Sequence, residues 1–127
     1  MIRELMYIEL KSGYSDNGPA WIGYVAASKT KKTIYFDDHA FQKYNGGSSN
    51  YYDIETGEDY WITGVKTRES NRHWAGSGKI MVDDRAVDRL LELIGEDTLP
   101  HIFETVTMED RFPVERVRQL LNTSPVR

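Results

Sequence analysis

Three side chains with different chemistry stand next to one another in a polar segment of the chain. Arg72, His73 and Trp74 can respectively hydrogen-bond, titrate and stack, and they lie within residues 67–78, TRESNRHWAGSG. Ligand sites favour loops that a rigid sheet holds in place. We therefore predict a ligand-binding surface made of Trp61, Arg72, His73 and Trp74. The same residues also fit a structural role, in which Trp74 fills one end of a small barrel and its neighbours pair with acids at the rim.

Residues 76–79, GSGK, end like a phosphate-binding loop. A Walker loop needs a glycine five residues before its second glycine, and a Ser or Thr after the lysine at the start of a helix. Here His73 holds the earlier position, Ile80 follows the lysine, and a strand is expected next. We interpret this segment as a turn.

Residues 37–39, DDH, offer carboxylates and an imidazole, as a metal site or an acid–base site would. Adjacent residues of a strand point to opposite faces, so only Asp37 and His39 could share one. His73 or His101 would have to complete a metal site from an unknown distance. We favour a solvated turn after a strand and expect no metal and no cofactor.

Four acids, Asp53, Glu55, Glu58 and Asp59, cluster around a predicted hairpin turn. Paired carboxylates can hydrolyse glycosides when one of them is buried and protonated, but acids at an exposed turn are normally solvated. The alternative function that they allow is a small enzyme, in which His73 works with Asp53 or Asp59 on a phosphorylated or sugar substrate.

The charge of the chain excludes binding driven by a strong basic field. The 127 residues carry a formal net charge of -4, whereas generic affinity for nucleic acid requires Lys and Arg to neutralise phosphates. The run 29–36, KTKKTIYF, still matches single-strand binders, which use a small antiparallel barrel with aromatic platforms and a positive groove. The lysines of this run also suit the protection of an edge strand.

The absence of cysteine removes disulfides, thiol catalysis and thiolate metal sites. Charges interrupt every apolar run near the N-terminus, and no segment approaches the roughly 18 apolar residues of a membrane span. We expect a soluble, cytoplasmic protein without a membrane partner.

Alternation and turn residues predict the elements that must position these groups. Strands are expected at residues 5–11, 21–27, 33–36, 51–54, 59–65 and 79–82. In the hairpin around residues 55–58, we expect Tyr52 opposite Trp61 and Asp53 opposite Tyr60. Residues 101–108 fit either a strand or a helix, and we favour a strand.

Two amphipathic helices are predicted in the last third of the chain. Val87, Leu90, Leu91 and Ile94 fall on one face of a helix over residues 84–95, which ends at a glycine. A second helix covers 112–122, with Pro113 in its first turn. The apolar faces of these helices could also form a dimer, so self-association is an alternative.

These patterns predict a single α+β domain over residues 1–127, mainly β over 1–82, mainly α over 83–122 and frayed over 123–127. Its β part is a bent antiparallel sheet or a small SH3-like or OB-like barrel of about five to six strands, against which the helices pack.

Four segments carry a resemblance: GPAWIG at 18–23, TIYF at 33–36, YYDIETGEDYWITGVK at 51–66 and RHWAGSGKI at 72–80. Together they resemble a family of small bacterial proteins to which the label deoxyxylulose-phosphate synthase is sometimes attached. Such a synthase resembles transketolases, is several times longer, and holds thiamine diphosphate through Gly-Asp-Gly, which this chain lacks. The resemblance therefore implies a bacterial origin and no catalytic residue.

The favoured function is a small non-enzymatic binding module that recognises a protein, a nucleic acid or a nucleotide-like ligand through Trp61 and the polar loop at 72–74. The alternatives are the His73 enzyme and a self-associating regulatory or structural protein.

Overall fold

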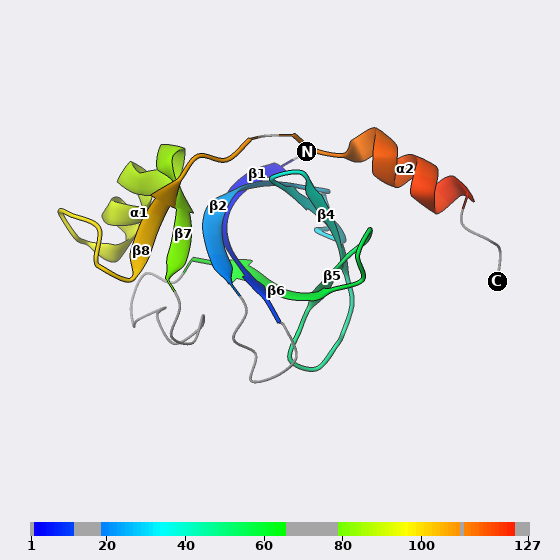
Figure 1. Cartoon of the computed structure of the whole chain (residues 1–127), viewed down its shortest axis with the longest axis horizontal. Helices are drawn as coiled ribbons and strands as arrows, with labels where there is room; N and C mark the ends of the chain where they lie inside the picture. The colour runs from blue at the N-terminus through cyan, green and yellow to red at the C-terminus, as the bar shows by residue number, and fades with distance from the viewer. Residues whose placement is uncertain (1, 12–18, 66–78, 110, 124–127) are drawn as a thin grey trace.

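Six consecutive strands close into a barrel in the computed structural model, which describes residues 2–11, 19–65, 79–109 and 111–123 (Figure 1). The strands are β1 (Ile2–Leu10), β2 (Ala20–Ala27), β3 (Thr33–Phe36), β4 (His39–Lys43), β5 (Tyr51–Asp53), β6 (Asp59–Gly64), β7 (Ile80–Asp83) and β8 (Phe103–Val106). The helices are the 3-10 turn η2 (Asp84–Ala86), α1 (Val87–Ile94) and α2 (Val114–Thr123).

The barrel is an antiparallel meander, since each of its strands pairs with the next along the chain and β1 also pairs with β6. Alternation along β1 divides its side chains between two cores. Met6 and Ile8 point into the barrel, while Leu5 and Tyr7 belong to a second apolar cluster on the outer wall. The predicted α+β class with a small barrel is therefore confirmed.

The outer edge of β2 is shared between two partners. Residues Ala26 and Ala27 pair with β3, whereas residues 20–22 pair in parallel with β7. Strand β8 then joins β7, also in parallel, after the chain has crossed over through η2 and α1. This β7–α1–β8 unit covers the outer wall of the barrel (Figure 1). Leu90 of α1 packs in the same cluster as Tyr7 and Ile22.

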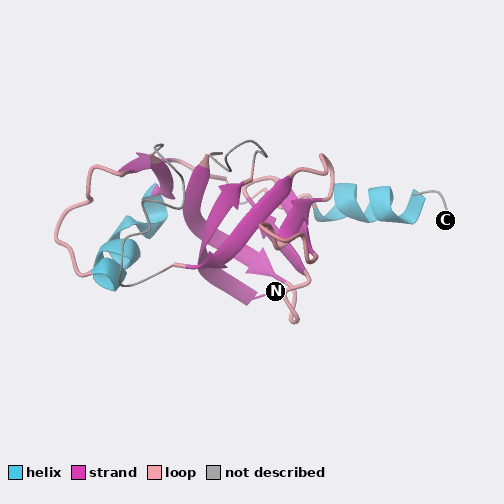
Figure 2. Cartoon of the chain, turned by 90° about the horizontal axis from the view of Figure 1, so that it is seen from below, coloured by secondary structure: helices cyan, strands magenta, loops and turns pink. Residues whose placement is uncertain are grey.

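The last described segment leads away from the opposite side of the barrel. Met108 is buried in the barrel core, and the ring of Phe112 lies 6.2 Å from that of Tyr35. Helix α2 begins next to the barrel, where Val117 is buried, and then projects outward on the side opposite to α1 (Figure 2).

Both predicted helices are present, and residues 103–106 form the favoured strand, although it is parallel to its neighbour. Strand β4 has no counterpart among the strands expected from the sequence. Helix α1 ends as predicted, because Gly95 takes a left-handed conformation and donates its N–H to the carbonyl of Leu91. Within the described ranges, no helix is long and apolar enough to cross a membrane.

The predicted hairpin between β5 and β6 is present, but its predicted register is wrong. Both pairs are shifted by two residues, so Tyr52 lies opposite Asp59 and Tyr60 lies opposite Tyr51. The turn is centred one residue earlier than predicted, because the N–H of Asp53 binds the carbonyl of Glu58, its carbonyl oxygen accepts the N–H of Gly57, and its side chain caps the turn. The predicted partners were Trp61 for Tyr52 and Tyr60 for Asp53.

Candidate functional site

The surface predicted from the sequence is only partly within the described residues. Arg72, His73 and Trp74 lie outside them. Trp61 lies on the outward face of β6, with 37% of its surface exposed. It pairs with the buried Glu9 of β1, so it stands on the outer wall of the barrel.

A different pair of predicted groups comes together at one end of the barrel. The β3–β4 connection is a two-residue turn, in which Asp37 and Asp38 have positive φ angles of 43° and 70°. Such a turn matches the twist of the flanking strands, and aspartate tolerates the left-handed conformation better than most residues. The turn places His39 opposite Phe36, on the strand face that points into the barrel.

Asp53 ends strand β5 on the same inward face, because it pairs with Phe41. Its side chain is 1% exposed. Its Oδ1 accepts the main-chain N–H groups of Glu55 at 2.8 Å and Thr56 at 3.1 Å. Its Oδ2 lies 3.1 Å from Nδ1 of His39. Asp53 is therefore a buried turn cap that also orients an imidazole, which corrects the interpretation of this acid as solvated.

The hydrogen bond shifts the titration of both partners. The bond to Asp53 raises the pKa of His39, and the charges of Asp53, Asp37 and Asp38 add to the effect against the opposing cost of burial. Burial alone would raise the pKa of the Asp53 carboxyl, but the bonds from His39, Glu55 and Thr56 outweigh it and lower that pKa. The pair thus favours imidazolium facing carboxylate.

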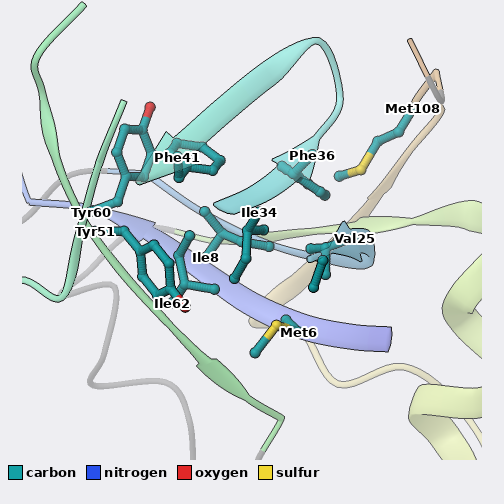
Figure 3. Close-up of a cluster of buried hydrophobic side chains, with 11 residues drawn as sticks. Met6, Ile8, Val25, Ile34, Phe36, Phe41, Tyr51, Tyr60, Ile62 and Met108 are labelled. Atoms are coloured by element: carbon teal, nitrogen blue, oxygen red, sulfur yellow. The ribbon is translucent and has the colours of Figure 1, made fainter. Parts of the chain in front are cut away.

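A hollow of about 50 Å³ lies beside this pair. Its lining is mostly apolar and aromatic, and Asp37 and His39 add two polar groups at the turn. The lining residues are Ile8, Trp21, Phe36, Asp37, His39, Phe41 and Tyr60. The rings of Phe41 and Tyr60 have centroids 4.6 Å apart. Figure 3 shows these two rings side by side, with the Tyr60 hydroxyl directed away from the aliphatic side chains of the core.

Two polar atoms of residues that line the hollow have no partner among the described residues. The hydroxyl of Tyr60 makes no hydrogen bond there, although the residue is only 5% exposed. Burial, with the nearby charges of Glu58 and Asp53, raises the pKa of this phenol to about 12. The second unpartnered atom is Nε2 of His39, since the imidazole bonds Asp53 through Nδ1.

Arg116 of α2 joins the two turns that hold this site. Its guanidinium binds the carboxylate of Glu55 through Nε at 2.5 Å and through Nη2 at 2.8 Å. Both Nη atoms also lie 3.4 Å from Oδ1 of Asp38. Asp38 lies next to His39, and Glu55 lies in the turn that follows Asp53. Arg116 therefore links the turn before His39 to the turn after Asp53.

We compared the chain with family models, curated proteins and solved structures. No match was found in any of the three comparisons. The resemblance to a bacterial family therefore stays a prediction, and the function has to be argued from the site. Among the residues that the structure describes, no three metal-binding side chains gather into one group.

His39 and Asp53 were both candidates from the sequence, but no sequence pattern joined them. His39 was expected in a solvated turn, and Asp53 was assigned to the hairpin or to His73. The missing step was the pairing of β4 with β5, which sets Phe41 opposite Asp53 and brings the carboxylate to the imidazole. Tyr60 was placed in the hairpin without a role in the site. Its side chain can be assigned to the inside of the barrel only when the closure of the barrel is known.

Proposed function

We propose that this protein is a small non-enzymatic binding module whose ligand inserts one small group into the end of the barrel. The observation that carries the proposal is the aromatic hollow, which is lined by the buried Tyr60, whose hydroxyl has no partner in the described part of the chain. Buried polar groups are nearly always hydrogen-bonded, so a group of this kind indicates a place for water or a ligand.

The size of the hollow limits how much of the ligand enters. Pockets that enclose a drug-sized molecule measure roughly 300–1,000 Å³, far more than the 50 Å³ found here. The remainder of the ligand must then lie across the rim, where Asp37 and His39 stand. This geometry suits the end of a side chain or a small substituent of a larger partner.

A fragment screen by NMR tests the proposal. We expect at least one small polar fragment to shift the side-chain resonances of Trp21, Phe41 and Tyr60 together, because these rings line one hollow. Tyr60→Phe removes the unpartnered hydroxyl with little change of shape and should weaken that fragment. Fragments that bind Tyr60→Phe and wild type equally, or that never shift these rings, would contradict the proposal.

The surface that contains Trp61, Arg72, His73 and Trp74 remains a separate proposal for the same function. Trp61 lies on the outer wall of β6, whereas the hollow opens at the end of the barrel. The two places can be distinguished by Trp61→Ala, which should leave binding in the hollow intact. Loss of fragment binding in a folded Trp61→Ala variant would assign the ligand to the outer wall.

The His39–Asp53 bond favours a second candidate function, an acid–base enzyme. A carboxylate that binds Nδ1 fixes the tautomer and leaves Nε2 to move a substrate proton. We rank it second because the described lining of the hollow has no hydroxyl group other than that of Tyr60, and because the hollow is too small for both halves of a cleaved substrate. An activity with a pH profile that His39→Gln abolishes would reverse this order.

A further inference from the structure

We infer that the group received by the hollow is a small alkylammonium, such as the end of a lysine side chain or a free primary amine. This inference rests on the proposed function and adds the chemical class of the ligand. Its starting point is the lining, in which Trp21, Phe36, Phe41 and Tyr60 surround a space of about 50 Å³. Aromatic faces attract cations, and a compact cation fits such a space.

The charged groups around the mouth have the sign that a cation requires. Asp37 lines the hollow, and its Oδ1 accepts the N–H of Glu109 at 3.1 Å. Its Oδ2 has no partner within the described ranges. Near it, Asp38 and Glu55 share the single guanidinium of Arg116. An anion entering here would face an excess of carboxylates.

The polar atoms of the hollow can accept the protons of an ammonium group. With Asp53 holding Nδ1–H, a neutral His39 presents the lone pair of Nε2. The hydroxyl oxygen of Tyr60 and Oδ2 of Asp37 are further acceptors. An alkylammonium carries up to three N–H donors, which matches these three acceptors in number.

Protonation of His39 opposes this binding, since an imidazolium would repel the ammonium and lose its lone pair. The charged groups that act on the imidazole are Asp37, Asp38 and Asp53, and Tyr60 lines the same hollow. Behind them, Arg116 binds both Asp38 and Glu55. The carboxylates stabilise both the imidazolium and the ammonium, so the two cations compete for the same negative charges. Binding of the amine should therefore strengthen as the pH rises through the pKa of His39.

The test uses three probes of equal length: n-butylammonium, n-butanol and butyrate. Each is titrated into the full chain while NMR follows the rings of Trp21 and Tyr60. Butylammonium should bind tightest, by roughly twofold to thirtyfold over butanol. Its affinity should rise with pH in wild type and stay flat in His39→Gln, which cannot titrate.

Asp37→Asn removes the charge at the mouth and keeps a residue that tolerates the positive φ of this position. We expect a severalfold loss of butylammonium affinity. Asp97→Asn makes the same charge change between α1 and β8 and serves as the matched control, with affinity unchanged.

The outcomes separate the two proposals. If butyrate or butanol binds tightest in the hollow, or if Asp37→Asn binds butylammonium like the control, the ammonium inference is overturned and the proposed function stands. If none of the three probes, nor any fragment of the wider screen, shifts the rings of the hollow, both are overturned.

Discussion

At the scale of single residues, the His39–Asp53 pair ties the stability of the fold to pH. The folded state holds the pKa of His39 above its ordinary value of 6.5 and that of Asp53 below its ordinary value of 3.8. The contribution of His39 is therefore complete below about pH 6.5 and is lost as the pH rises through the raised pKa. The contribution of Asp53 is complete above about pH 3.8 and is lost as the pH falls through the lowered pKa.

We predict that the difference in unfolding free energy between wild type and His39→Gln is largest between these limits and shrinks on both sides. Glutamine retains hydrogen-bonding groups but does not titrate in this range. Urea denaturation at a series of pH values measures the difference. A difference that is constant from pH 3 to pH 8 would show that the pair does not form in solution.

At the scale of elements, Gly23 of β2 is a point of close packing inside the barrel. A Cβ at this position would lie 2.7 Å from Cε1 of Phe36 and 3.1 Å from Sδ of Met108. This glycine allows Phe36 to close the barrel beside the point where β2 divides its edge between β3 and β7.

Gly23→Ala should destabilise the fold by about 1–3 kcal/mol, the usual cost of adding a methyl group to a packed core. Gly64→Ala in β6 is the control, because a Cβ there meets nothing within 4 Å. It should be neutral or slightly stabilising. Thermal or urea unfolding of the two variants gives the comparison, and equal stabilities would mean that Phe36 does not pack on Gly23.

Arg116 gives helix α2 a polar contact with two turns of the barrel. Arg116 binds Glu55 and Asp38, whereas Arg118 pairs only with Glu115 of the same helix in the described part of the chain. We predict that Arg116→Ala speeds amide hydrogen exchange in α2 and at the β3–β4 turn, with little change in global stability. Arg118→Ala should leave exchange at the turn unchanged, and similar exchange in both variants would refute the role of Arg116.

At this scale the sequence predicted most of the elements for clear reasons. Leu90 and its helical neighbours have the period of a helix, and Gly95 supplies the left-handed stop. The hairpin register failed because the turn depends on a side-chain cap by Asp53, which local patterns do not show.

At the scale of the whole molecule, closure of the barrel creates the candidate site. His39 comes from the start of β4, Asp53 from the end of β5, and Tyr60 from β6. Their side chains converge because the three strands are neighbours in the barrel and present the same face inward. A sequence shows the alternation of each strand, but it does not show which inward residues share one end of a closed barrel.

The central claim is that a ligand group enters the barrel rather than resting on its outer wall. Intermolecular NOEs between a bound fragment and side-chain protons test it most directly. We predict NOEs from the fragment to Phe41, Tyr60 and Trp21, together with a shift of the His39 ring resonances. NOEs to Trp61 and Tyr52 alone would place the ligand on the outer wall and contradict this account.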